Sequence, residues 1–316
     1  MKITKVWAVY FSPTGNAKKV VTTMAKRAAE CLGVPMGTVD FTLPENREGV
    51  VSFDKEDLAF FSTPVYAGRI PNKMLPYVQT AFEGNGALAV AVSVFGNRNF
   101  DNGLIELRNE LEAHGFHTVA GAGIPTEHVF SSKLATGRPD ADDLVKIAEF
   151  GEKVAEKVSG LTEIPEKIAV RGDDPVGAYY TPLGTDGKPA VFLKAKPKTD
   201  PEKCTKCGIC ATVCPMGSIP KDAPDTCTGI CIKCQACVRK CTKHAKYFDD
   251  AAFLSHVAML EQTGQAFVIR PPIPLEIGSM ERDPAQLRRV YDTGRAVAEI
   301  QVDKIAAFVE QSRAAE

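Results

Sequence analysis

The segment Lys5-Val6-Trp7-Ala8-Val9-Tyr10-Phe11-Ser12-Pro13-Thr14-Gly15-Asn16-Ala17 decides the fold of the N-terminal part of the chain. Apart from the lysine, its first six residues are apolar or aromatic, and they predict a buried strand over Lys5–Tyr10. The turn that follows leads into the amphipathic stretch Asn16–Leu32, which predicts a helix. A strand followed directly by a helix is the repeating unit of a parallel sheet.

The same alternation continues to about residue 160. Further strands are predicted at Gly37–Phe41, Leu58–Ser62, Ala87–Val94 and Thr118–Ile124, and further helices at Pro71–Phe82, Asn102–His114 and Asp140–Val158. Apolar strands interleaved with helices indicate a sheet covered on both faces, and right-handed crossovers favour a doubly wound order. The predicted fold class is therefore α/β, a five-stranded doubly wound parallel sheet.

Nine of the ten cysteines lie between Cys204 and Cys241, and Cys31 stands apart. Eight of them form two C-x2-C-x2-C-x3-C runs: Cys204, Cys207, Cys210 and Cys214, then Cys231, Cys234, Cys237 and Cys241. This spacing is typical of iron–sulfur ligation and predicts two [4Fe–4S] clusters in a small α+β domain. Structural zinc sites usually come from separated C-x2-C pairs, and disulfide scaffolds spread their cysteines over a small secreted chain.

Cys227 belongs to neither run. A buried bystander, a cluster ligand and a redox thiol all remain open for it.

Changes in composition along the chain, together with the positions of glycine and proline, divide the sequence into four expected parts. We expect a domain at 1–160, a connecting arm rich in Gly and Pro at 161–190, the cysteine domain at 191–248, and a C-terminal helical extension at 249–316 with helices at Ala251–Gln262 and from about Ala285. The net charge of −1 gives nucleic-acid binding no support. With no apolar run near the ~20 residues that span a bilayer, and no signal-peptide pattern at the N-terminus, we expect a cytoplasmic protein without membrane insertion.

Three loops follow strands at the edge where doubly wound sheets bind ligands. In chain order these flavin loops are Phe11–Ala17, Thr63–Pro71 and Phe95–Asp101. Hydroxyl, amide and backbone N–H groups of the first loop suit a phosphate at a helix N-terminus, and Tyr66 and Phe100 offer faces for a flavin ring. The residues expected to bind FMN are Ser12, Thr14, Gly15, Asn16, Ala17, Thr63, Pro64, Val65, Tyr66, Ala67, Gly68, Phe95, Gly96, Asn97, Asn99, Phe100 and Asp101.

With these loops and cysteine runs, residues 1–160 resemble flavodoxins and Val191–Phe248 resembles bacterial two-cluster ferredoxins. The whole chain resembles the flavodoxin–ferredoxin fusion proteins of anaerobic bacteria and archaea. That resemblance implies non-covalent FMN, two [4Fe–4S] clusters and low-potential electron transfer. The chain departs from the pattern at Ala17, where many flavodoxins have threonine, and at Thr242, where proline would follow the last cysteine. The only tryptophan, Trp7, lies in the first strand, so Tyr66 would have to stack on the flavin.

In two-cluster ferredoxins the fourth cysteine of each run binds the other cluster. The resemblance therefore implies a crossed ligand set. One cluster is expected on Cys204, Cys207, Cys210 and Cys241, and the other on Cys231, Cys234, Cys237 and Cys214.

These cofactors predict an electron-transfer flavoprotein that links one-electron carriers such as ferredoxin to a two-electron acceptor. An alternative is a reductase that acts on a small oxidised substrate over the FMN ring, with His128 as a catalytic proton donor. A third hypothesis is a redox sensor that signals through Cys227 or the C-terminal helix. No G-x-G-x-x-G follows a strand, so the sequence gives direct NAD(P)H oxidation no support.

The charge of the cysteine domain indicates a partner. Eleven Lys and Arg face four Asp and Glu between Lys194 and Tyr247. Such a basic surface favours docking of an acidic ferredoxin or a similar carrier, although these lysines could instead only offset cluster charge. A homodimer that brings flavin and clusters together between chains also remains open.

Overall fold

The computed structural model describes residues 2–263 and eight positions beyond them, at 285, 288, 289, 291, 292, 295, 299 and 302. Met1–Gly264 form one compact unit, and Gln265–Glu316 form a second. Most of the helix expected from about Ala285 lies outside the described residues. The boundaries expected near residues 160, 190 and 248 stay predictions.

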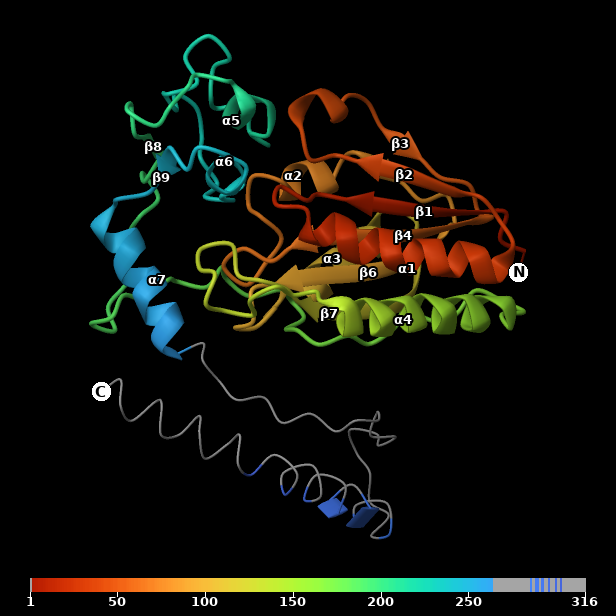
Figure 1. The fold of residues 1–316 in the computed structure, drawn as a ribbon. Coiled ribbons are helices and arrows are strands. Elements are labelled where there is room, and N and C mark those ends of the chain that lie inside the picture. Colours follow the sequence, from red (N-terminus) through yellow and green to blue (C-terminus); the bar gives the residue numbers. More distant parts are fainter. Residues whose placement is uncertain are drawn as a thin grey trace. The chain divides into compact units, whose positions relative to one another are not determined.

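A five-stranded parallel sheet forms the centre of the first unit (Figure 1). Its strands are β1 (Lys5–Tyr10), β2 (Met36–Asp40), β4 (Asp57–Pro64), β6 (Leu88–Phe95) and β7 (His117–Pro125), in the order β2-β1-β4-β6-β7. The chain therefore winds outward in one direction from β1 to β2 and then in the other from β4 to β7. This is the flavodoxin-like doubly wound order, as predicted, and its ligand crevice lies at the carboxyl ends of β1 and β4.

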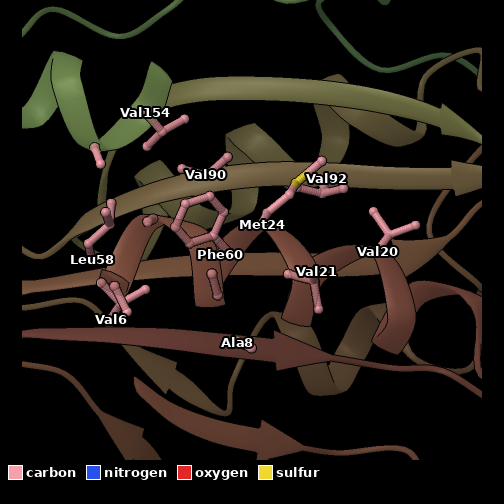
Figure 2. Close-up of a cluster of buried hydrophobic side chains, with 14 of the residues drawn as sticks. Val6, Ala8, Val20, Val21, Met24, Leu58, Phe60, Val90, Val92 and Val154 are labelled. Carbon is pink, nitrogen blue, oxygen red and sulfur yellow. The ribbon is translucent and has the colours of Figure 1, made fainter. Parts of the chain in front are cut away.

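Helices cover both faces of the sheet. On one face α1 (Asn16–Leu32) and α4 (Ala141–Ser159) pack against each other and against the strands, where Met24, Phe60 and Val90 belong to one buried cluster (Figure 2). The helices approach closely because Gly151 has no side chain: a Cβ there would lie 2.2 Å from the carbonyl oxygen of Met24. On the other face α3 (Gly103–Ala113) packs in a second cluster, which is rich in phenylalanine.

The helix predicted over Pro71–Phe82 is wrong in extent. Within this range only α2 (Leu75–Val78) is an α-helix. Two short elements lie between β2 and β4: a 3-10 turn at Pro44–Asn46 and strand β3 (Val51–Ser52). Pro76 has no N–H to donate and its ring would clash with a preceding turn, so a helix through this residue can only begin just before it. At the other end Phe82–Glu83 forms strand β5, which pairs with β3.

The cysteine module contains only short elements: β8 (Lys198–Thr199), α5 (Ile209–Thr212), α6 (Ala236–Arg239) and β9 (Lys246–Tyr247), followed by the longer α7 (Ala251–Thr263). β8 and β9 pair antiparallel. The helix expected over Ala251–Gln262 is thus present. None of the helices in the described part of the chain is long and apolar enough to cross a membrane.

The two cysteine runs share one backbone pattern. The residue two after the first cysteine is left-handed in both, at Lys206 and Lys233, and so is the residue after the second cysteine, at Gly208 and Gln235. Gly217 and His244, each three residues after a fourth cysteine, are left-handed as well. Three pairs of residues at equivalent positions share these unusual conformations, and only the lysine pair is identical in sequence. The repeat therefore extends from the sequence to the backbone.

Candidate functional site

The eight cysteines of the two runs line two separate cavities. A cavity of about 350 Å³ is lined by Cys204, Cys207, Cys210 and Cys241. A second cavity, of about 360 Å³, is lined by Cys214, Cys231, Cys234 and Cys237, together with Cys227. The structure therefore brings the cysteines together in the two crossed sets expected from the sequence. We call these the first and second cysteine cavities.

Backbone groups turn toward the sulfur atoms at equivalent places. The N–H of Ser218 donates to Sγ of Cys214 at 3.3 Å, and the N–H of Ala245 donates to Sγ of Cys241, also at 3.3 Å. Each donor lies four residues after the fourth cysteine of its run. Such N–H groups stabilise a thiolate, which is the form that binds metal.

The net pKa shifts of the cysteine thiols have opposite directions at different positions. Burial raises the pKa of Cys237 to about 12 and raises the pKa of Cys234 further. Burial also acts to raise the pKa of Cys241, but backbone N–H groups outweigh it and the net pKa is lowered. The buried pair would therefore stay protonated unless a positively charged group replaced the protons.

A buried cation lies beside the first cysteine cavity. Lys246 lines this cavity, is 3% exposed, and its Nζ has no hydrogen-bond partner. An unpaired buried ammonium is costly, so an anionic group in the cavity would relieve it. A [4Fe–4S] cluster on four thiolates carries such a negative charge, and the residues present therefore fit it. Within residues 2–263, no three His, Cys, Asp or Glu side chains are arranged to hold a single metal ion.

The first flavin loop lines a cavity of about 440 Å³ at the carboxyl edge of the sheet. Ser12, Thr14, Asn16 and Ala17 contribute to its wall. The backbone N–H of Ser12 donates to Oγ1 of Thr42 at 2.9 Å, and the N–H of Lys18 donates to Oγ of Ser12, also at 2.9 Å. These bonds fix the turn, while the first turn of α1 leaves N–H groups without helical partners. An anion such as a phosphate fits this arrangement. We call this space the phosphate-side cavity.

A larger cavity of about 1670 Å³, its open mouth included, adjoins the phosphate-side cavity. Its walls come from the second and third flavin loops, the connecting arm, the cysteine module and α7. Six residues line both cavities: Val65, Tyr66, Phe95, Gly96, His128 and Val129. We call the larger space the ring-side cavity.

Not all of the residues expected at the flavin line these two cavities. Pro64 lines the phosphate-side cavity, and Ala67, Gly68 and Asn99 line the ring-side cavity. Gly15, Thr63, Asn97, Phe100 and Asp101 line neither. The ring of Phe100 packs edge-on against Phe95, with centroids 5.4 Å apart.

Tyr66 belongs to the second flavin loop and lies near Cys231 and Cys234 of the second cysteine cavity. Its side chain lines both flavin cavities. Burial raises the pKa of its phenol well above the ordinary value, and the neighbouring Cys234 and Cys231 raise it further. Cys231 itself also lines the ring-side cavity. The two sites therefore share a wall.

Two arginines hold the cysteine module against the doubly wound sheet. Arg239 of α6 donates to Oε1 of Glu127 at 2.6 Å and to the backbone carbonyls of His128 and Val129. Arg47 donates to the carbonyl oxygen of Pro215 at 2.8 Å. Each contact is close to a cysteine of the second cavity, since Arg239 follows Cys237 and Pro215 follows Cys214.

His128 lies in the loop after β7 and lines both flavin cavities. Burial lowers its pKa to about 4, helped by the nearby His256, Arg239 and Arg98. Its Nδ1 accepts the N–H of Phe130 at 3.1 Å, so the proton of the neutral ring is on Nε2. At neutral pH this side chain is a neutral hydrogen-bond donor, and its catalytic role stays a prediction.

The sequence analysis missed the part that the connecting arm plays in the site. Tyr179 and Tyr180 line the ring-side cavity. The N–H of Tyr180 donates to the carbonyl of Ala67 at 2.7 Å, and the hydroxyl of Tyr179 donates to the carbonyl of Ile70 at 3.0 Å. Two adjacent tyrosines within a segment rich in Gly and Pro were the available signal.

Two family models match parts of the chain. A 4Fe-4S binding domain matches residues 197–219, and a domain of unknown function (DUF6363) matches residues 235–310. A search of curated proteins finds no match. The chain thus combines a doubly wound sheet of flavodoxin-like order with a match to a 4Fe-4S binding domain.

Solved structures share similarity with about half of the chain. A flavodoxin from the domain Archaea is 16% identical over 49% of this chain and 99% of its own, with a TM-score of 0.35. A Streptococcus pneumonia TIGR4 flavodoxin is 16% identical over 48% of this chain and 99% of its own, with a TM-score of 0.35. Rubredoxin oxygen:oxidoreductase from Desulfovibrio gigas is 14% identical over 50% of this chain and 37% of its own, with a TM-score of 0.36.

Proposed function

We propose that this chain is an electron-transfer flavoprotein that passes electrons between two [4Fe–4S] clusters and an FMN held in the same chain. The observation that carries the proposal is the wall shared by the ring-side cavity and the second cysteine cavity. Ile230, Cys231 and Ile232 belong to that wall, and Tyr66 of the ring-side cavity lies near Cys231 and Cys234. Electron transfer requires close cofactors, and Cys231 lines both spaces.

The flavin would be held by backbone and neutral side chains. The first turn of α1 and the loop around Ser12 and Thr14 would bind the phosphate, and Tyr66 would lie against the ring. Bound FMN would supply one- and two-electron chemistry, and the clusters one electron each. The chain's own contribution is to orient the cofactors and to keep water from the space between them.

The clusters would be bound by the crossed cysteine sets. Cys204, Cys207, Cys210 and Cys241 would hold one, and Cys214, Cys231, Cys234 and Cys237 the other. Only the second set contributes to the ring-side cavity, through Cys231. Cys207 of the first set is exposed. Electrons would therefore enter or leave at the first cluster and reach the flavin through the second.

The partner proposed at the first cluster is an acidic one-electron carrier such as a ferredoxin. Lys203, Lys206 and Lys243 are exposed close to Cys204, Cys207 and the first cavity. Complementary charge would steer the carrier to this surface and make the rate fall as salt rises. Electron transfer from an acidic ferredoxin that is insensitive to ionic strength would contradict this docking.

An anaerobic reductive titration tests the proposed function. The purified full chain should release about one FMN and contain about eight iron atoms, and its flavin and cluster absorbance should bleach in one titration. Tyr66→Ala should weaken flavin retention and uncouple the two signals, because its ring lines both flavin cavities and lies near Cys231 and Cys234. Tyr247→Ala is the matched control, since Tyr247 is 41% exposed and lines none of these cavities. Zinc in place of iron, or a chain that binds no flavin, would overturn the proposal.

A further inference from the structure

We propose that the ring-side cavity binds a second small molecule, a planar aromatic anion, next to the FMN. This inference rests on the proposed flavin site, because the flavin loops form one wall of the cavity. It goes further by assigning the opposite walls to a ligand of defined chemistry. Those walls belong to the connecting arm, the cysteine module and α7.

The cavity has walls that the flavin loops do not provide. Its lining extends to the connecting arm, the cysteine module and α7. The phosphate-side cavity provides separate space for the other end of FMN. Residues that do not belong to the flavin loops, such as Tyr179, Phe192 and Leu260, therefore remain as walls for another molecule.

Aromatic rings dominate these walls, and they are fixed by packing. Phe192 stacks on His256 with centroids 5.4 Å apart, and it contacts Phe253 edge-on at 5.5 Å. Phe130 also packs against Phe253, at 4.9 Å. His256 in turn is held through its Nδ1, which lies 2.8 Å from the carbonyl oxygen of Leu183. Rings held in this way form a preorganised slot for a flat apolar ligand.

The charged side chains on the cavity wall are all basic. Lys73, Arg98 and Lys233 line it, and none of the lining residues is Asp or Glu. The guanidinium of Arg98 lies 4.2 Å from the ring centroid of Tyr180 and pairs with Asp101. Lys233 donates to the carbonyl oxygens of Leu193 and Cys231, which carry no formal charge. The lining therefore favours a ligand with a negative group and disfavours a cationic one.

The ligand class follows from these two features together. A flat hydrophobic body matches the aromatic walls, and a carboxylate matches the basic residues. Because the site adjoins the flavin loops at Tyr66 and His128, such a ligand would lie within reach of the ring that they hold. This is the arrangement that a substrate or an inhibitor of flavin chemistry needs.

Calorimetry on the full chain, with FMN and iron content measured beforehand, tests this inference. The probe is trans-cinnamate, and its neutral analogue cinnamamide is the matched ligand control. We expect cinnamate to bind FMN-loaded protein without releasing FMN, and cinnamamide to bind at least about tenfold more weakly. No binding of cinnamate, equal binding of both compounds, or release of FMN by cinnamate would overturn the inference.

Variants locate the binding. Lys73→Gln removes an exposed cation from the cavity and should weaken cinnamate about fivefold. Phe192→Ala removes a wall and should weaken it about tenfold. Lys26→Gln makes the same charge change at a residue of α1 whose side chain is 73% exposed and does not line the cavity. This variant should leave binding unchanged. Equal effects of Lys73→Gln and Lys26→Gln would contradict the proposed site.

The outcomes separate this inference from the proposed function. Protein that retains FMN and iron but does not bind cinnamate would leave the electron-transfer proposal standing and remove this one. Protein that retains no FMN would overturn the proposed function, and with it the placement of a ligand beside the flavin.

Discussion

Two large clusters of buried apolar side chains lie on the two faces of the doubly wound sheet, whereas the cysteine module has one small cluster of Cys210, Ile219 and Cys237. The sheet has strands of up to nine residues, but the strands of the module have two residues each. Hydrophobic burial is therefore sufficient to fold the first region. The second region has cysteines where a core should be, and its fold must depend on what those cysteines bind.

Removing the iron is expected to have the largest effect on this difference. In chelator-treated, iron-free protein, backbone amides of residues 198–247 should exchange hydrogen at least ~100-fold faster, because the module loses its main cross-link. Amides of β1 and β6 should keep their protection. Hydrogen exchange followed by mass spectrometry measures both regions in one sample. Equal protection of the module with and without iron would mean that its apolar contacts suffice.

Loosening the packing of α1 against α4 should destabilise the sheet and leave the iron content of the cysteine module unchanged. Gly151→Ala places a Cβ 2.2 Å from the carbonyl oxygen of Met24, and the forced separation of α1 and α4 should cost about 2–4 kcal/mol in the free energy of unfolding. Chemical denaturation followed by circular dichroism measures this cost. Gly160→Ala at the end of α4 is the control, since its Cβ would be 3.6 Å from the nearest atom. The iron content should be unchanged in both variants.

Lys246 provides a test of the charge beside the first cysteine cavity. In loaded protein, Lys246→Met should lower the reduction potential of the proposed first cluster, because it removes a buried positive charge that favours the reduced form. Coulomb's law with a dielectric constant of ~20 gives ~2 kcal/mol at ~8 Å, or roughly 90 mV for one electron.

A potentiometric titration followed by electron paramagnetic resonance measures the shift in this potential. Lys203→Met is the control, because Lys203 is 60% exposed and its charge is screened by water. Equal shifts in the two variants would mean that burial of Lys246 has no special effect.

The pH dependence of the sheet region should be the smallest effect. Burial lowers the pKa of His128 from 6.5 to about 4 in the folded chain, so the unfolded chain binds the proton first as the pH falls. The stability due to neutral His128 is full above pH 6.5 and is lost toward pH 4. Between pH 6.5 and 5.5 the loss should be about 1 kcal/mol. His128→Gln should remove this part of the slope, as measured by urea unfolding at several pH values.

Sequence reasoning succeeded where local pattern and buried periodicity determine the structure. The strand Lys5–Tyr10 and the helix Asn16–Leu32 were predicted with the bounds that the structure has, because an apolar run and a helical stripe define each of them. Each cysteine cavity is lined by one of the crossed sets that the resemblance implied, and the role of these cysteines as cluster ligands stays a prediction. The helix expected at Pro71–Phe82 is only four residues long, because Pro76 has no N–H to donate and so allows a helix to begin only just before it.

The remaining features depend on contacts between distant residues. Nothing local indicates that Tyr180 bonds to Ala67, more than 100 residues earlier, or that Arg239 bonds to Glu127. Burial of Lys246 runs against the usual exposure of lysine. The wall that the two cavities share at Cys231 lies against the flavin loops only because these contacts hold the module on the sheet, and a sequence pattern does not encode such docking.

The most direct test of electron transfer within the chain is anaerobic stopped-flow reduction of the loaded protein by dithionite. Cluster absorbance should bleach first, and flavin absorbance should follow with a first-order rate that is the same at every protein concentration. A flavin phase whose rate rises in proportion to protein concentration would mean that electrons pass between chains. A flavin that stays oxidised while the clusters are reduced would contradict the central claim.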